Sequence, residues 1–137
     1  MRAYKAAVPV AASELTKSVV RVIHKDLVTV TPVDESTALS NWQVATQQPL
    51  FLFLPAYEVG SHGSTKEESA QLAILQAEQA LDNKQPGDTV YITNAAPYIR
   101  RLNDGYSKQE PAGFVERAKL LGRKTVNKLG LRLDKYV

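Results

Sequence analysis

The stretch TVYITNAAPYIRRLNDG at residues 89–105 joins a predicted β-strand to a predicted short helix. Apolar and polar residues alternate over its first six positions, Thr89 to Asn94, which is typical of a half-buried strand. Pro97 favours a first helical turn because its fixed φ angle suits that position, and this turn should reach Leu102. The Asn-Asp-Gly that follows is a turn signal. The stretch therefore predicts a strand that is followed at once by a short helix.

Upstream of this stretch, the sequence predicts a long amphipathic helix. Apolar residues recur at helical spacing after Ser13, whose side chain can cap the helix. The helix should end by about Thr31, because Pro32 disfavours helical geometry in the residue before it. Residues 1–12 lack this pattern and are expected to form an N-terminal arm, so that a single domain would occupy residues 13–137.

Two further helices are predicted. Ser64 and Glu67 match a capping box, in which each side chain bonds an otherwise unpaired backbone N–H, and a helix should follow from about residue 65 to residue 83. Its expected buried stripe is Ala70, Ala73, Ile74, Ala77 and Leu81. Pro111 should open the last helix, in which Gly122 costs about 1 kcal/mol relative to alanine. The expected apolar face of this last helix is Phe114, Ala118, Leu121 and Leu129.

Two more segments have the character of strands. Residues 41–46 place Trp42 and Val44 on one face, and residues 50–54 are the apolar run Leu-Phe-Leu-Phe-Leu. We therefore expect an α+β domain in which a small, mostly antiparallel sheet of three to four strands packs with about three helices. Within it, Trp42 and Tyr98 are expected to be buried anchors.

The sequence contains few residues that suggest an enzyme. It has no cysteine, which excludes thiolate nucleophiles, disulfides and cysteine-based zinc sites. Its two histidines, His24 and His62, are distant in sequence and make a poor metal site, and we expect His24 at the surface or rim of the first helix. Neighbouring carboxylates occur at 34–35 and 67–68, but adjacent residues diverge rather than face each other across a cleft. We therefore expect a non-enzymatic protein without catalytic residues, metal or cofactor; a hydrolase that uses Asp34 and His62 is the weaker alternative.

Charge is divided unevenly along the chain. Residues 1–90 carry seven basic and ten acidic side chains, whereas residues 91–137 carry ten basic and four acidic ones. On the last helix we expect Arg117, Arg123, Lys124 and Lys128 to face an acidic protein surface or DNA, with a merely solvated face as the equally weighted alternative. No aromatic residues are interleaved with these cations, so base stacking is not indicated. No apolar run approaches the roughly 20 residues of a membrane span, so no membrane partner is expected.

Two segments resemble a family of small tailed-phage neck proteins, the minor tail components or tail-completion proteins. The first segment, TPVD at 31–34, ends a helix and is followed by an Asn-Trp pair; the second, YITNAAPYI at 91–99, is followed by a glycine, SKQ and PAG. The order and spacing of the two segments are also similar to those of the family. The residues that carry the resemblance are Thr31, Pro32, Val33, Asp34, Trp42, Asn94, Pro97, Tyr98, Gly105, Pro111 and Gly113. The chain departs from the family in having Glu35-Ser36 where Thr-Gly is usual.

The resemblance implies structural roles for these residues. Asn94, Pro97 and Tyr98 would turn a strand into a helix, Gly105 would supply an unusual backbone angle, and residues 111–113 would start the last helix. The family implies a virion protein, made in the host cytoplasm, that forms a ring of identical subunits, six being the expected number, at the head–tail junction or the tail end. Its partners would be itself, the neighbouring head-connector and tail proteins and, by non-specific contact, passing DNA. The alternative is a cytosolic nucleic-acid-binding protein that uses the basic last helix.

Overall fold

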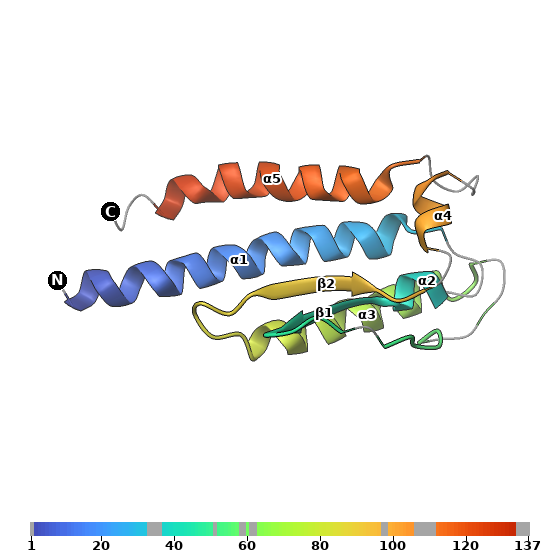
Figure 1. Cartoon of the computed structure of the whole chain (residues 1–137), viewed down its shortest axis with the longest axis horizontal. Coiled ribbons are helices and arrows are strands. Elements are labelled where there is room, and N and C mark those ends of the chain that lie inside the picture. Colours follow the sequence, from blue (N-terminus) through green and yellow to red (C-terminus); the bar gives the residue numbers. More distant parts are fainter. Residues whose placement is uncertain are drawn as a thin grey trace.

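The computed structural model describes residues 2–32, 37–50, 52–57, 60, 63–96, 99–105 and 112–133, with side chains in the first helix from Ser13 onward and in the last as far as Lys128. Within these ranges the chain forms five helices and two strands (Figure 1). In chain order they are α1 (Arg2–Val30), α2 (Thr37–Ser40), β1 (Trp42–Thr46), α3 (Lys66–Asp82), β2 (Val90–Asn94), α4 (Ile99–Asn103) and α5 (Phe114–Leu133). No described helix has the length and apolar character that a membrane span requires.

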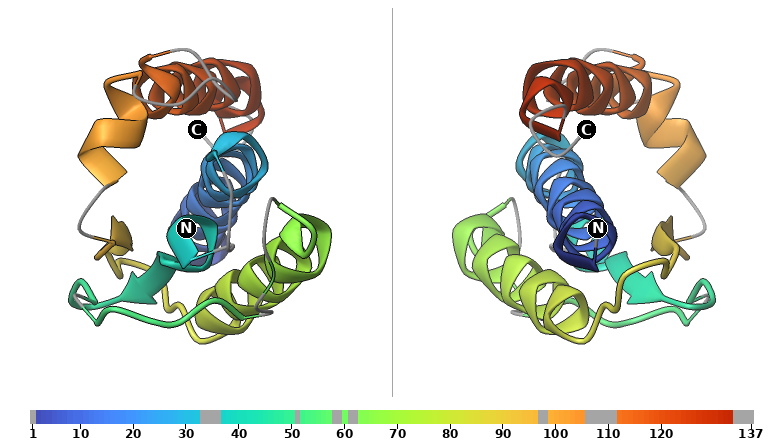
Figure 2. Two further views of the ribbon diagram at one scale, coloured as in Figure 1. Left: turned by 90° about the vertical axis from the view of Figure 1, so that its right-hand side faces the viewer. Right: turned by 90° about the vertical axis from the view of Figure 1, so that its left-hand side faces the viewer.

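Helix α1 is the central element of the molecule. Figures 1 and 2 show α5 along one side of α1, running in the opposite direction, whereas α3 and the two-stranded sheet of β1 and β2 lie on the other side. Helices α3 and α5 therefore lie on opposite sides of α1. The short helix α4 bridges from the end of β2 towards the start of α5.

The sheet is a single antiparallel pair. Trp42 lies opposite Asn94, and the register continues along the strands. The amide side chain of Gln76 in α3 covers the outer edge of β1: its Oε1 accepts from the Val44 N–H at 3.3 Å and its Nε2 donates to the Val44 carbonyl at 3.0 Å. Because this side chain occupies the edge at Val44, no third strand of the described residues pairs there. The α+β class is confirmed, but the described residues form two strands rather than three or four.

The predicted strand at 50–54 is wrong for the residues described in it. This segment runs beside β1 and is held there by hydrogen bonds from side chains of residues 41 and 43, not by backbone-to-backbone strand pairing. The Asn41 amide donates to the Leu54 carbonyl and accepts from its N–H, both at 2.8 Å, and the Gln43 amide donates to the Leu52 carbonyl at 2.7 Å. Asparagine and glutamine side chains can form such bonds with the backbone, a competition that the apolar pattern of 50–54 does not reveal.

Helix α1 is longer than the sequence predicted. It begins at Arg2, so residues 2–12 continue the helix and Ser13 is an interior position rather than its cap. The Ser13 hydroxyl is buried and accepts a hydrogen bond from Nζ of Lys84 at 2.9 Å, which joins α1 to the segment that follows α3. The expected end of the helix before Pro32 is confirmed.

Helix α3 forms where the sequence placed it, but its capping is different. The N-cap residue is Thr65 rather than Ser64, and it makes no side-chain cap bond, so the capping box is absent. The buried stripe is Ser69, Ala73, Ala77 and Leu81, at a spacing of four residues. Ala70 and Ile74, expected in that stripe, are half-buried on its flank.

Helix α5 packs against α1 through a face that contains one aromatic residue and two small ones. Phe114, Ala118 and Gly122 are buried, at the four-residue spacing of one helix face. Leu121, expected on this face, is exposed, and the side chain of Leu129 lies outside the described residues. The helix is therefore rotated relative to the predicted stripe, because glycine rather than leucine occupies the contact with α1.

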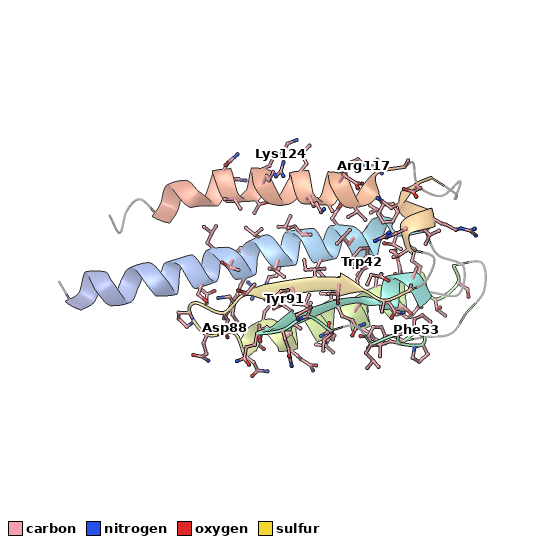
Figure 3. The ribbon with its side chains drawn as sticks, viewed as in Figure 1. Trp42, Phe53, Asp88, Tyr91, Arg117 and Lys124 are labelled. Carbon is pink, nitrogen blue, oxygen red and sulfur yellow. The ribbon has the colours of Figure 1, made fainter. Side chains whose placement is uncertain are left out.

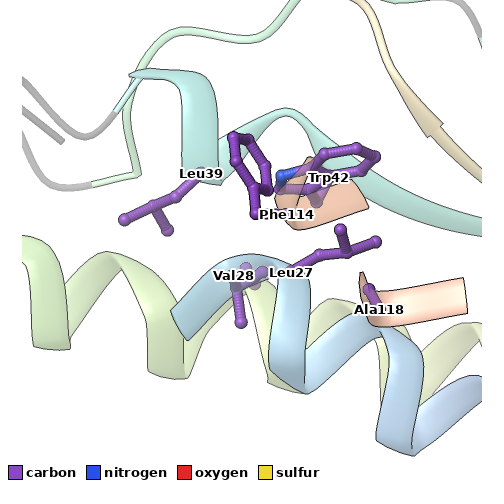
Figure 4. Close-up of a cluster of buried hydrophobic side chains, with 7 residues drawn as sticks. Leu27, Val28, Leu39, Trp42, Phe114 and Ala118 are labelled. Atoms are coloured by element: carbon purple, nitrogen blue, oxygen red, sulfur yellow. The ribbon is translucent and has the colours of Figure 1, made fainter. Parts of the chain in front are cut away.

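Residues from five elements form the main apolar core (Figure 4). The cluster consists of Leu27 and Val28 from α1, Leu39 from α2, Trp42 from β1, Ala73 from α3, and Phe114 and Ala118 from α5. The expected burial of Trp42 is confirmed. A second cluster continues the core along α3 and contains Val20, Val44, Ala77 and Leu81.

Candidate functional site

Trp42 is the centre of a buried polar junction between α1 and β1. Its indole Nε1 donates to Oγ1 of Thr31 at 2.7 Å, and that hydroxyl in turn donates to the Leu27 carbonyl at 2.5 Å. On the other side, Nε2 of His24 donates to the Trp42 carbonyl at 2.9 Å. The polar atoms named here bond one another in place of water, so the arrangement fixes β1 against α1.

The position of His24 corrects the expectation from sequence. The residue is only 1% exposed and does not lie at the helix surface or rim. Burial lowers the pKa of His24 below its ordinary value near 6.5, partly opposed by the hydrogen bond to the Trp42 carbonyl and by the charge of Glu78. The neutral ring with its proton on Nε2 is the form that this carbonyl selects. His24 is therefore suited to a structural junction.

Asn94 forms a second structural joint, next to the one around Trp42. It lies opposite Trp42 in the sheet register. Its Nδ2 donates to the Ala38 carbonyl of α2 at 2.9 Å, and its Oδ1 accepts from the Ala96 N–H at 2.9 Å. The second of these bonds closes a local turn of the kind asparagine favours. Asn94 thus ends β2, turns the chain and holds α2 at the same time.

A third joint connects α4 to the start of α5. Gly105 has a φ of +94° and Gly113 a φ of +85°, values that favour glycine, so the unusual backbone angle expected at Gly105 is confirmed. The Asn103 side chain accepts from the Val115 N–H at 2.9 Å and donates to Glu116 at 3.0 Å. That bond from Asn103 is the main reason why the pKa of Glu116 is lowered. Asn103 therefore satisfies a backbone donor in the first turn of α5.

An open hollow of about 460 Å³ lies where these joints meet. Its described lining is Trp42, Asn94, Ile99, Arg100, Asn103, Asp104 and Val115. Asn94 and Asn103, the hydrogen-bonding groups of the joints, are already committed to structural bonds. The hollow is therefore a concave surface at the end of the sheet. Its described residues include no free pair of groups arranged for acid–base chemistry.

The outer side of the molecule carries an exposed apolar segment beside β1. Leu52 is 62% exposed and Phe53 is 49% exposed, and Figure 3 shows Phe53 at the periphery. Tyr57, at the end of the segment, turns inward against the main core, and burial raises the pKa of its hydroxyl. Two adjacent large apolar side chains on a surface are candidates for contact with another protein.

The basic face predicted on α5 is present. Arg123, Lys124 and Lys128 are exposed, and Figure 3 shows Lys124 on the side away from α1. Arg117 is also exposed, but its Nη1 donates to the Ala112 carbonyl at 2.7 Å, so this side chain folds back over the start of the helix. The predicted basic face of α5 is therefore formed by Arg123, Lys124 and Lys128, whereas Arg117 is held at the start of the helix by its bond to the backbone.

Sequence reasoning missed an acidic counterpart on α3. Glu67, Glu68 and Asp82 are exposed on this helix. Leu72 and Leu75 are exposed between them along the helix, at 37% and 53%. The signal was visible in the sequence, since four carboxylates and one lysine fall within the helix.

Several residues that sequence analysis singled out lie outside the described part of the chain. They are Val33, Asp34, His62, Pro97, Tyr98 and Pro111. The hydrolase alternative depends on two of them. Among the residues that are described, no three histidine, aspartate or glutamate side chains come together to hold a metal ion.

Comparison with known proteins does not place the chain in a family. No protein-family description, no characterised protein and no solved structure matches it. The functional argument therefore depends on the molecule's own residues.

Proposed function

We propose that this protein is a structural subunit of the virion of a tailed phage, located in the neck or at the tail end. It assembles there as a ring of identical copies and takes no part in catalysis. The ring joins head-connector and tail proteins, and the copies are made in the host cytoplasm before they enter the particle. The proposal extends the family resemblance of the sequence to the function of the molecule.

The observation that carries this proposal is the meeting of the two segments that resemble the phage family. Thr31 and Trp42 of the first segment are joined by a hydrogen bond, and Trp42 of the first lies opposite Asn94 of the second. Gly105 and Gly113, farther along the second segment, have the left-handed angles that position α5. Residues that carry the resemblance and also form one structural joint support the proposal better than scattered positions would.

The chemistry of this joint also favours a structural role. His24, Asn94 and Asn103 use their side chains to hold elements together. A ring of copies requires head-to-tail contacts between two different surfaces of the subunit. The exposed segment with Leu52 and Phe53 and the charged faces of α3 and α5 offer such surfaces.

The test is to locate the protein in particles made by the genome that encodes it. A gold-labelled antibody against this chain should bind at the head–tail junction or at the tail end in electron micrographs. An image of the purified ring, or of the neck, should show an open centre. Particles that contain none of this protein by antibody and by mass spectrometry would refute the proposal.

A nucleic-acid-binding protein is the second candidate, and the exposed cations of α5 favour it. Lys119, Arg123, Lys124 and Lys128 are available for phosphate contacts. A protein of this kind should lose DNA affinity steeply as salt rises, with a slope set by the number of phosphates contacted. Reversal of Arg123, Lys124 and Lys128 to glutamate should abolish that binding. A virion protein whose α5 faces another protein should bind DNA weakly from the start.

A further inference from the structure

We propose that copies of this chain associate head to tail, with the acidic face of α3 in one copy against the basic face of α5 in the next. This inference rests on the proposed ring and names the two surfaces that build it. The acidic face is Glu67, Glu68, Leu72, Leu75 and Asp82; the basic face is Lys119, Leu120, Arg123, Lys124 and Lys128.

The two faces are on opposite sides of one molecule. Figures 1 and 2 show α1 between α3 and α5. The buried sides of both helices point inward: Ala73 and Ala77 are buried in α3, and Ala118 and Gly122 are buried in α5. The exposed faces therefore point outward in different directions. Two unlike surfaces so placed cannot pair within one copy, and between copies they give a heterologous contact, which closes into a ring or extends into a filament.

The charges of the two faces are complementary. On α3, Glu68 and Asp82 bracket the exposed face, and on α5, Arg123 and Lys124 lie beside its centre. Glu78 of α3 is already paired, because its Oε1 accepts from Nε of Arg21 in α1 at 2.8 Å. Because the two faces carry opposite charge, an α3–α5 contact between copies is attractive, whereas α3–α3 and α5–α5 contacts are repulsive.

Each face also has apolar side chains at its centre. Leu75 of α3 is 53% exposed and Leu120 of α5 is 50% exposed, although neither helix places them against the core. An interface needs this combination of an apolar centre and a charged rim. Water is excluded from the leucines while the charges around them fix partner and orientation.

In an isolated copy, both faces contain unfavourable electrostatic interactions. Lys119 and Arg123 are four residues apart, as are Lys124 and Lys128, so like charges stack along α5. In α3, Asp82 lies in the last turn, where the helix already concentrates partial negative charge. A neighbouring copy that presents the opposite charge offsets the unfavourable interactions on each face. Surface ion pairs are individually weak, so a single contact is short-lived and gains persistence when the head connector or tail assembles several copies.

The absence of cysteine makes the contact directly testable. Leu75→Cys and Leu120→Cys are made as separate full-length variants, mixed and oxidised, so that even a transient contact is trapped as a disulfide. The control replaces Leu75→Cys by Glu14→Cys, at an exposed residue of α1 outside both faces. The Leu75–Leu120 heterodimer should form at least about tenfold faster than the control pair, which corresponds to about 1.4 kcal/mol. Equal rates for the two pairs would overturn the inference.

Charge exchange gives a second, independent measurement on the same disulfide. Adding Lys119→Glu, Arg123→Glu and Lys124→Glu to the Leu120→Cys chain should reduce its cross-linking to Leu75→Cys about tenfold. Adding Glu67→Lys, Glu68→Lys and Asp82→Lys to the Leu75→Cys chain should restore it. Circular dichroism and melting curves verify that each variant is folded. If the reversed pair does not recover, α5 meets something other than α3.

The result is separable from the proposed function. Antibody labelling of particles decides whether the protein belongs to the neck or tail, and cross-linking decides how copies meet. Labelled particles in which the Leu75→Cys/Leu120→Cys double variant forms no covalent chains of copies would refute only the α3–α5 contact. Efficient cross-linking together with unlabelled particles would refute only the virion role.

Discussion

Gly122 of α5 faces Ile23 of α1 so closely that a methyl group at Gly122 would lie 2.7 Å from Cγ1 of Ile23 and nearer still to its Cδ1. The missing side chain lets the two antiparallel helices approach, and the isoleucine fills the space. This explains why a helix breaker stands inside α5 at a cost of about 1 kcal/mol in helix propensity. The close contact between α1 and α5 therefore requires both Gly122 and Ile23, because the large side chain fits only where the other helix has none.

Gly122→Ala should therefore destabilise the protein by about 1–3 kcal/mol, because overpacking outweighs the gain in helix propensity. In the background of Ile23→Ala the same change should become neutral or stabilising by up to about 1 kcal/mol. Denaturant unfolding of the four proteins of this cycle measures the coupling. Additive effects of the two substitutions would show that the helices do not meet there.

Stability should fall as the pH is lowered through the range where His24 titrates. Burial holds the pKa of His24 below 6.5, so the unfolded state takes up a proton at a pH where the folded state resists it. Stability contributed by neutral His24 is thus present above 6.5 and is lost as pH falls towards the lower folded pKa, by at most about 1.4 kcal/mol per pH unit.

This pH dependence can be isolated because only one other histidine exists. His62→Gln serves as the reference, and His62→Gln with His24→Gln as the test. The reference should lose more free energy of unfolding than the double variant between pH 7 and pH 5. Parallel pH profiles for the two would mean that His24 is not buried in neutral form.

Trp42→Ala should destabilise the protein by about 3–5 kcal/mol, since it removes a buried aromatic ring from the main core. Trp42→Phe keeps an aromatic ring in the core but removes the indole N–H that donates to the Thr31 hydroxyl. This loss should cost about 1–3 kcal/mol. Thr31→Val in the Trp42→Phe background should recover part of that loss. A nearly unchanged melting temperature for Trp42→Ala would place the residue at the surface, contrary to the structure.

The segment that includes Leu52 and Leu54 should loosen when its side-chain tethers are removed. Asn41→Ala and Gln43→Ala delete bonds to the Leu54 and Leu52 backbone. The loss of about 1 kcal/mol of local stability should speed chymotrypsin cleavage after Leu52 or Phe53 about fivefold. Gln48→Ala, at an exposed residue, is the matched control. Equal cleavage rates in all three variants would show that the bonds do not restrain the segment.

Much of the fold follows from local sequence. Helix α3 and the strands at β1 and β2 were predicted within a few residues, because apolar periodicity reflects which face is buried. Pro32 was enough to end α1, and the unusual backbone angle that the family resemblance implied at Gly105 is a left-handed one. The cationic character of α5 is likewise a property of composition. These features depend on neighbours in the chain or on side-chain chemistry.

Tertiary structure decided the features that depend on partners distant in sequence. The burial of His24 follows from the Trp42 carbonyl, and the loss of a third strand follows from the amide side chains of Asn41, Gln43 and Gln76. Only the close approach of α1 explains Gly122. The sequence by itself determined two clusters of opposite charge; the packing of α3 and α5 on opposite sides of α1 decided that they face outward and away from each other, because each helix buries its small residues against the centre.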